Sequence, residues 1–138
     1  MVEISVKYEG DLHCFAIHKP SRAELCTDAP TDNFGKGEAF SPTDLAATSL
    51  GVCMLTTMAI VAAKQSLDLD LSGTRAIVRK HMTTKPPRRI QRLEVSMEIP
   101  LPETLSSRPT LEEAALNCPV ALSLHPEIEK AVTFSWRS

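Results

Sequence analysis

The stretch SPTDLAATSLGVCMLTTMAIVAA, residues 41–63, decides the fold of this 138-residue chain. Ser41 and Asp44 match a capping box, in which each side chain accepts a hydrogen bond from the backbone N–H of the other, and Pro42 occupies the first helical position. After Asp44 the stretch carries no charged residue. It therefore predicts a helix from Pro42 to about Ser66 that is uncharged on every side from Leu45 to Ala63.

The uncharged span from Leu45 to Ala63 is long enough to cross a lipid bilayer. However, it contains several hydroxyl side chains, no basic cluster flanks it, and strand-like segments lie on both sides of it in the sequence. A buried core helix is the simpler interpretation of a helix that is apolar all round. Because a domain of this length seldom surrounds a helix of about six turns on every side, we expect a second copy of the chain to cover part of it, in a homodimer.

The composition of the whole chain is that of a globular protein, with 43% hydrophobic and 23% charged residues. We expect one domain over residues 1–138. The formal net charge of −2 argues against broad electrostatic binding to nucleic acid or to an anionic membrane. The chain begins MVEISVKYEG, which alternates polar and apolar residues and carries charges, unlike a signal peptide. The expected compartment is the cytoplasm, where thiols stay reduced.

Alternating apolar residues and turn signals predict strands on both sides of the helix. The predicted strands cover residues 3–8, 12–18, 22–26, 74–82 and 90–99, and a last segment through Val132, Phe134 and Trp136. The strands at 74–82 and 90–99 are expected to form a hairpin. Thr110 with Glu113 matches a second capping box, which would open a short helix. The expected fold class is α+β with antiparallel strand pairing.

The chain has four cysteines, Cys14, Cys26, Cys53 and Cys118, and none of them forms a C-x-x-C pair. Their spacing, with four scattered His residues, matches no zinc module. If the cysteines act, they act as reactive thiols. Cys14 and Cys26 lie in predicted strands, where a free cysteine is most often buried packing.

Cys118 precedes Pro119, and the residue before a proline is pushed away from helical geometry. Cys118 is therefore expected at the N-cap of a new helix, where the dipole and unpaired N–H groups would lower its pKa. A buried cysteine at a helix break is the alternative that the residues leave open. Cys53 lies about three turns past Ser41, beyond the reach of the dipole, so its activation would need a basic partner from another segment. Composition alone favours Cys53 as core packing.

Two segments, GKGEAFSPTDLAATSLGVC at residues 35–53 and NCPV at residues 117–120, together resemble the OsmC/Ohr family. The resemblance implies an N-terminal antiparallel sheet, a long buried central helix, a β-hairpin, short helices and a C-terminal strand, in an intertwined homodimer with its sites at the subunit interface. It also implies a thiol-dependent peroxidase that reduces organic hydroperoxides in oxidative stress defence. Cys53 would be the peroxidatic cysteine and Cys118 the resolving cysteine. The implied partners are a small organic hydroperoxide and an external dithiol reductant, with no cofactor and no metal.

Two positions depart from the peroxidase pattern of that family. Thr43 stands where the family carries a Glu after the helix-opening proline, and the first hairpin, YEGDLHC at residues 8–14, contains no Arg. The candidates to support the thiolate instead are Glu38, Asp44, Arg22 and His13. Because nine residues along an ideal helix end half a turn out of phase, Asp44 is expected to point away from Cys53 and to serve as a cap.

The alternative function is that of an OsmC-like homodimer that is not a peroxidase. Such a protein would bind an apolar small molecule at its interface, with its cysteines as sensors or as packing. The two hypotheses predict different changes in free thiols when an organic hydroperoxide is added.

Overall fold

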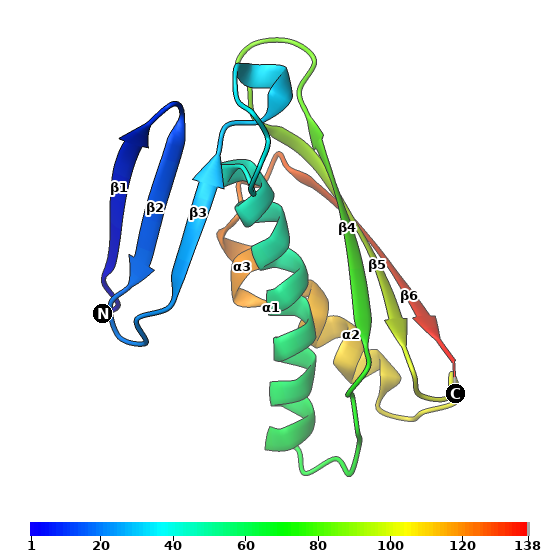
Figure 1. The fold of residues 1–138 in the computed structure, drawn as a ribbon. Coiled ribbons are helices and arrows are strands. Elements are labelled where there is room, and N and C mark those ends of the chain that lie inside the picture. Colours follow the sequence, from blue (N-terminus) through cyan, green and yellow to red (C-terminus); the bar gives the residue numbers. More distant parts are fainter. Residues whose placement is uncertain (138) are drawn as a thin grey trace. The chain divides into compact units, whose positions relative to one another are not determined.

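The computed structural model describes residues 1–137, and the chain divides into two compact units, Met1–Ala46 and Ala47 onward. The strands are β1 (Ile4–Gly10), β2 (His13–His18), β3 (Glu24–Asp28), β4 (Arg75–Met82), β5 (Ile90–Ile99) and β6 (Glu129–Trp136). The helices are α1 (Pro42–Lys64), α2 (Arg108–Leu116) and α3 (Pro119–Ser123), with a short 3-10 turn, η1 (Thr31–Asn33). Figure 1 shows these elements, which confirm the α+β class.

The first unit contains a three-stranded antiparallel sheet in the order β1-β2-β3. The turn between β1 and β2 has a positive φ at Gly10. Ile4, Val6 and Tyr8 share one side of β1, because alternate residues of a strand point the same way. These three side chains are 60%, 65% and 62% exposed. The sheet therefore presents an exposed apolar side.

A buried carboxylate holds the segment between β3 and α1 within the first unit. Asp28, at the end of β3, is 3% exposed, and its Oδ2 accepts a hydrogen bond from Glu38 N at 3.0 Å. Gly35 passes so close to the carbonyl of Ala29 that a Cβ would overlap the carbonyl oxygen. The segment is thus folded back on the end of β3, and only glycine fits at its tightest point.

α1 begins with the capping box that the sequence predicts. Ser41 N donates to Asp44 Oδ2 at 2.9 Å, and Asp44 N donates to Ser41 Oγ at 3.1 Å. Each bond satisfies an N–H group that has no partner inside the helix. The helix begins at Pro42 as predicted and ends at Lys64, slightly before the expected Ser66.

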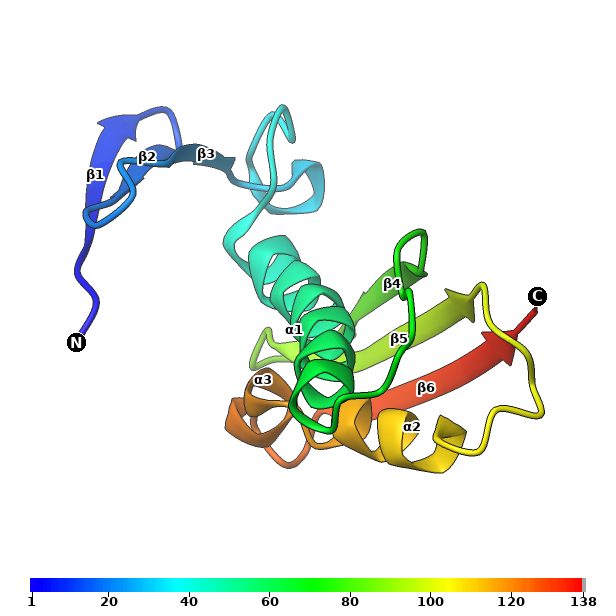
Figure 2. The same ribbon diagram turned by 90° about the horizontal axis from the view of Figure 1, so that it is seen from below.

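The second unit has the sheet order β4-β5-β6, and its helices lie on one side of that sheet, as Figure 2 shows. Along β5, Leu93, Val95, Met97 and Ile99 are each 1% exposed or less and alternate with more exposed polar side chains. This period of two places one side of the sheet against the helices and leaves the other side to solvent. The predicted hairpin of β4 and β5 is confirmed.

α1 packs on this sheet through a stripe of buried residues spaced four apart. The stripe consists of Leu50, Met54, Met58 and Ala62. The closest approach is at Gly51, where a Cβ would lie 2.7 Å from Cγ2 of Val78 on β4. The helix meets the length and composition of a membrane span, but this buried stripe is what a core helix has. The structure therefore supports the core interpretation of α1.

Two expectations about the second unit are wrong. β6 pairs with β5 in parallel, not antiparallel. The chain between these strands passes through α2 and α3, and such a crossover returns the next strand in the same direction. α2 begins at Arg108, so Thr110 lies inside its first turn, and the expected capping box with Glu113 does not open the helix.

Candidate functional site

Cys53 lies on α1 between the buried side of the helix and its exposed side. It is half-buried and is flanked in sequence by the exposed Val52 and the buried Met54. One turn further along, Thr57 Oγ1 lies 3.8 Å from Cys53 Sγ. The two side chains share a face because residues four apart in a helix lie one above the other.

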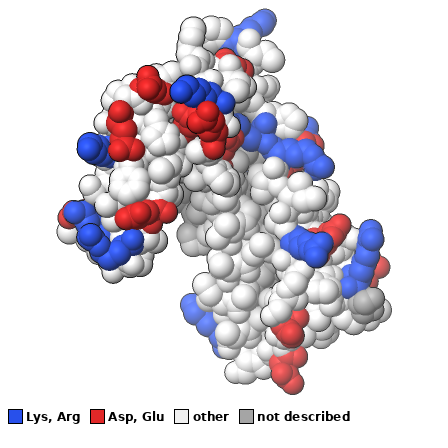
Figure 3. Space-filling model, in the orientation of Figure 1, with Lys and Arg blue, Asp and Glu red and all other residues white. Residues whose placement is uncertain are grey.

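From Thr48 to Ala63 the exposed side of α1 is uncharged. The exposed residues of this span are Thr48, Val52, Thr56, Ala59, Ile60 and Ala63. Val52 and Ile60 are 54% and 50% exposed. In Figure 3 no coloured side chain covers the visible surface over the middle turns of α1. The helix therefore presents uncharged surface to solvent as well as to its own core.

The second cysteine, Cys118, is the N-cap of α3, as the sequence predicts. Its extended backbone, with φ −64° and ψ 154°, satisfies the restriction that Pro119 imposes. Its sulfur accepts a hydrogen bond from Ala121 N at 3.5 Å, and the residue is fully buried. The break between α2 and α3 thus fixes the sulfur in one position.

The fold brings the two sulfurs together although 64 residues separate them in the chain. Burial raises the pKa of Cys53, but the backbone N–H of Val120, the thiol of Cys118 and the hydroxyl of Thr57 act on its sulfur as donors and lower the pKa. The resulting pKa lies below the ordinary value for a cysteine. The three donors are neutral groups of the described second unit, so none of them is the cation that the sequence led us to expect.

The pKa of Cys118 shifts in the opposite direction. Burial raises it most, the N–H of Ala121 partly offsets this, and the neighbouring Cys53 raises it further. The N-cap position was expected to lower this pKa, and that expectation is wrong, because the fully buried thiol loses its hydration and faces a second sulfur that carries negative charge. Within the pair, Cys53 therefore loses its proton first, and Cys118 keeps its proton and donates it in a hydrogen bond.

The remaining two cysteines lie on the sheet of the first unit. Cys14 stands opposite Thr27 and Cys26 stands opposite Phe15 in the register of β2 and β3, so the two thiols point to opposite sides. Cys14 is half-buried, as packing would require, but Cys26 is exposed. The expectation of buried packing is wrong for Cys26, which lies on the edge strand β3 of this short sheet.

The four supporting candidates belong to the first unit, where each has a local role. His13 Nε2 lies 3.8 Å from Glu9 Oε1, and Arg22 has a left-handed backbone with φ 64°. Glu38 donates its backbone N–H to a buried carboxylate, and Asp44 caps α1, as expected. A role of any of them toward the thiolate stays a prediction.

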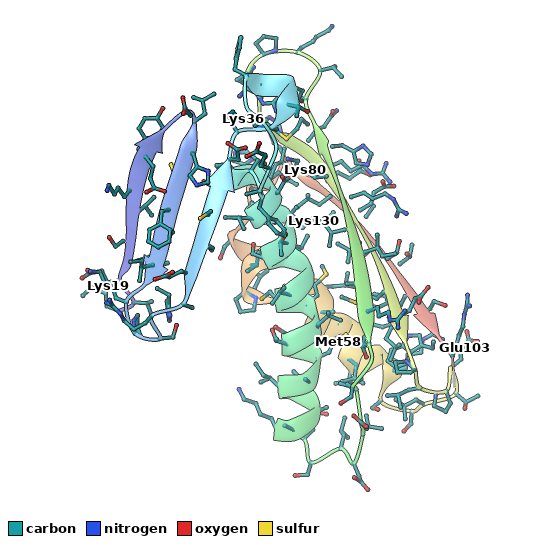
Figure 4. The ribbon with its side chains drawn as sticks, viewed as in Figure 1. Lys19, Lys36, Met58, Lys80, Glu103 and Lys130 are labelled. Carbon is teal, nitrogen blue, oxygen red and sulfur yellow. The ribbon has the colours of Figure 1, made fainter. Side chains whose placement is uncertain are left out.

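Two lysines that the sequence interpretation passed over lie on the helix-facing side of the second sheet. Lys80 on β4 and Lys130 on β6 both stand opposite Leu93, so the three side chains point the same way. In the view of Figure 4, both lysines lie above Met58, towards the end of the picture at which α1 starts. Because alternate residues of β4 point the same way, Lys80 shares a side with Val78. This alternation could have identified Lys80 from the sequence. Neither lysine is among the causes of the Cys53 pKa shift.

An apolar pocket of about 490 Å³ lies along the second half of α1. Its walls are α1 between Leu55 and Ala63 and the following segment 67–74. A smaller pocket of about 260 Å³ shares Leu55 and reaches Val78 on β4. Cys53 lines neither of these two pockets, although the uncharged run around it supplies residues to both. Among residues 1–137, no cluster of three or more His, Cys, Asp or Glu side chains could hold a metal ion.

The family to which the chain belongs follows from a direct comparison with family models. A model described as OsmC-like protein matches residues 35–132, which include both cysteines and residues of both units. The chain belongs to the OsmC-like family. A search of curated proteins gave no match.

Solved structures of OsmC-like proteins share the fold of the whole chain. A structure from Psychrobacter arcticus 273-4, named for osmotic stress induction and a detoxification response, is 44% identical, covers 97% of this chain and 96% of its own, and has a TM-score of 0.89. An OsmC-like protein from Mycoplasma pneumoniae is 16% identical over 100% and 98% of the two chains, with a TM-score of 0.80. An organic hydroperoxide resistance protein from Legionella pneumophila is 15% identical over 98% and 96%, with a TM-score of 0.74. The OsmC-like fold is therefore confirmed.

Proposed function

We propose that this OsmC-like protein is a thiol-dependent peroxidase that reduces organic hydroperoxides. In the first step the Cys53 thiolate attacks the terminal oxygen of the hydroperoxide, and the O–O bond breaks. The organic alkoxide leaves and takes up a proton to become an alcohol, while Cys53 becomes a sulfenic acid. The hydroperoxide is reduced and the sulfur is oxidised by two electrons.

The second step uses Cys118 as the resolving thiol. Its sulfur attacks the sulfenic sulfur of Cys53, an S–S bond forms, and the hydroxyl group leaves as water with the proton of Cys118. An external dithiol then reduces the disulfide by thiol exchange and becomes a disulfide itself, which restores both cysteines. No metal or organic cofactor is needed for this cycle.

The proposal rests on the closeness of the two thiols: Cys118 lowers the pKa of Cys53, and Cys53 raises the pKa of Cys118. This closeness supports a pair in which the half-buried sulfur reacts with peroxide and the fully buried sulfur waits beside it. The lowered pKa of Cys53 supports the same division, because the peroxidatic sulfur attacks the peroxide as a thiolate. The names of the Legionella relative and similar structures agree with the substrate class.

Counting free thiols by mass spectrometry after one equivalent of cumene hydroperoxide tests the proposal. The wild-type chain is expected to lose two thiols, Cys53 and Cys118, and Cys53→Ser is expected to lose none, because a serine hydroxyl is a far poorer nucleophile at neutral pH. The matched control is the double variant Cys14→Ser/Cys26→Ser, which should still lose two. An unchanged thiol count in the wild-type chain would reject the peroxidase proposal.

The variant Cys118→Ser separates the two roles. Cys53 should still be oxidised once, but without a resolving thiol it should remain a sulfenic acid and then proceed to sulfinic acid with excess peroxide. Peroxide consumption should stop after a single turnover. If both sulfurs were packing only, the two serine variants would instead show two similar, modest losses of stability.

We further propose that the chain works in the cytoplasm as a homodimer, with each chain a single OsmC-like domain. The uncharged, exposed side of α1 supports the dimer, since a second copy would cover a surface of this kind. The family model and the Psychrobacter relative both span the boundary between the two units, which supports one domain. Free cysteines suit a reducing compartment.

A second candidate function is the binding of an apolar small molecule without peroxide chemistry. The apolar pocket of about 490 Å³ favours it, because its volume suits a small ligand and Cys53 does not line it. Calorimetric titration with 1-decanol tests it, with Ala59→Leu as the variant that fills the pocket. Binding that Ala59→Leu abolishes, together with an unchanged thiol count after peroxide, would favour this function over the first.

A further inference from the structure

The hydroxyl of Thr57 has an unusual use for a threonine within a helix. Its Oγ1 lies 3.8 Å from Cys53 Sγ, a distance within hydrogen-bond range for sulfur. Among the described residues, that sulfur is its one hydrogen-bonding partner. A helical threonine more often donates to the backbone carbonyl three or four residues earlier. Thr57 instead directs its hydroxyl to the reacting atom of the site.

The neighbouring threonine shows the ordinary arrangement. Thr56 Oγ1 donates to Val52 O at 3.0 Å and to Cys53 O at 3.2 Å, and Thr56 is exposed. Two identical side chains, adjacent on one helix, thus differ in a single respect that bears on the thiol. The hydroxyl of Thr57 contacts the sulfur, and that of Thr56 contacts only backbone carbonyls.

We propose that Thr57 is a further catalytic residue of the pair, whose hydroxyl donates a hydrogen bond to the Cys53 thiolate and stabilises it in place of a cation. Its catalytic meaning rests on the peroxidase function proposed above. The sulfur of Cys53 receives its donors from two elements: Thr57 from α1, and Cys118 and Val120 from the start of α3. A thiolate that accepts several hydrogen bonds is stabilised against protonation, whether or not the donors carry charge.

Thr57 differs from the other two donors in how it is held. It is on the same continuous helix as Cys53, one turn away, so its position relative to the sulfur does not depend on α3. The thiol of Cys118 cannot donate while it is attacking the sulfenic acid, because its sulfur is then forming the new bond. Thr57 is therefore the side-chain donor that remains beside Cys53 throughout the cycle.

The groups that bear on the titration of Cys53 come from both packed elements. The start of α3 contributes the N–H of Val120 and the thiol of its N-cap, Cys118. The helix α1 contributes the hydroxyl of Thr57. Cys118 is the one titratable side chain named among them in the described second unit. Removal of the Thr57 hydroxyl should therefore move the titration of Cys53 without changing any charged neighbour on these elements.

The experiment measures iodoacetamide labelling of the Cys53 peptide by mass spectrometry across a pH series, in the absence of peroxide. In Thr57→Val, half-maximal labelling should move to higher pH, and labelling near neutral pH should be about threefold to tenfold slower. The labelling rate at high pH should not fall, because a thiolate of higher pKa is intrinsically more nucleophilic. A fall at high pH would indicate blocked access and would overturn the proposal.

Thr57→Ser and Thr56→Val are the matched controls. Thr57→Ser retains the hydroxyl and should keep the wild-type titration, and Thr56→Val removes a hydroxyl of the same helix that does not touch the sulfur and should also keep it. An unchanged titration in Thr57→Val, or an equal change in Thr56→Val, would overturn the proposal. If Thr57→Val does not fold, Thr57→Ala removes the same hydroxyl with less crowding and takes its place.

Peroxide consumption by the same variants separates this proposal from the proposed function. A slower first turnover in Thr57→Val, with the normal rate in Thr57→Ser, supports both. If the wild-type chain consumes no hydroperoxide, the peroxidase function is rejected, and a shifted labelling curve in Thr57→Val would still establish the hydrogen bond to Cys53. A shifted labelling curve with an unchanged first turnover would overturn the catalytic role of Thr57.

Discussion

The two sides of α1 have the same chemistry but opposite surroundings. On one side, Leu50, Met54 and Met58 are each 1% exposed or less and pack in the core of the second unit. On the other side, Val52 and Ile60 are about half exposed. Neither side carries a charge between Leu45 and Ala63. The helix therefore has the composition of one that is covered on both sides, and the second unit covers one of them.

Cys53 and Thr57 lie between these two sides, and this position suits a reactive thiol. A cysteine on the buried side would be inert, and one on the exposed side would lack fixed donors. Between them, Cys53 is accessible in part and still receives hydrogen bonds from Thr57 and from the start of α3. The comparison teaches that the partial exposure and the donors of Cys53 follow from its position between the two sides of α1, not from its distance from the helix end.

The largest expected effect comes from a charge on the buried side. Met58→Asp places an unpaired carboxylate where the native side chain is 1% exposed. The expected loss in the free energy of unfolding is on the order of 3–5 kcal/mol, enough to unfold many domains. Circular dichroism with thermal denaturation measures it. A folded variant with an unchanged melting temperature would show that this side is not core.

A charge on the exposed side should affect assembly and leave the fold intact. Ile60→Lys adds one unpaired charge from each copy to the proposed interface, and the dimer Kd should rise at least about tenfold, or about 1.4 kcal/mol. Sedimentation equilibrium at micromolar concentration measures it, with circular dichroism as the check on folding. Ile77→Lys is the control, because Ile77 is 54% exposed on the opposite side of the second sheet from α1. Equal effects of the two variants, or none, would argue against an interface on α1.

The cysteines between the two sides should label in a fixed order as pH rises. The fold lowers the pKa of Cys53 and raises that of Cys118, so the thiolate of Cys53 forms at lower pH than that of Cys118. Iodoacetamide labelling, resolved by peptide, should therefore reach its midpoint for Cys53 at lower pH. Coincident midpoints, or the reverse order, would contradict the proposed roles. A midpoint for Cys53 below about 6 would indicate that a cation also contributes.

The smallest expected effect concerns the point where α1 meets β4. A Cβ at Gly51 would lie 2.7 Å from Cγ2 of Val78, so Gly51→Ala should cost about 1 kcal/mol in the free energy of unfolding, through crowding. In a Val78→Ala background the same change should instead stabilise the protein by up to about 1 kcal/mol, because alanine favours a helix over glycine. Urea denaturation of the four proteins measures the reversal of sign. Equal effects in both backgrounds would mean that the contact with Val78 is not what selects glycine.

The elements of this fold could be predicted wherever the signal lies within a few residues. The capping box of Ser41 and Asp44 fixed the start of α1, and Pro119 fixed the place of Cys118 at an N-cap, because each signal acts through bonds to adjacent backbone. The alternation of β5 gave its bounds, Ile90–Ile99, as the structure has them. The similar capping pattern at Thr110 did not predict the start of α2, because that helix begins earlier, at Arg108 and the proline after it.

The candidate site could be predicted only in part. The two segments that resemble the OsmC/Ohr family pointed to Cys53 and Cys118, but the supporting groups named from sequence were charged side chains of the first unit. Thr57 and the N–H of Val120 were missed, since a hydroxyl and a backbone amide carry no sequence signal that marks them as thiol partners. Lys80 was missed although the alternation of its strand places it on the helix-facing side.

By itself, the sequence determined a single long helix with an uncharged span from Leu45 to Ala63, the strands around it, and two cysteines of one family pattern. These follow from local bonding and from periodicity, which depend on neighbours in the chain. Only the tertiary structure decided that β6 runs parallel to β5, which side of α1 is buried, and that Cys53 and Cys118 shift their pKa values in opposite directions. Each of these features depends on which distant segments come into contact and on how completely they exclude water. Both the contacts and the exclusion of water arise only when the chain has packed.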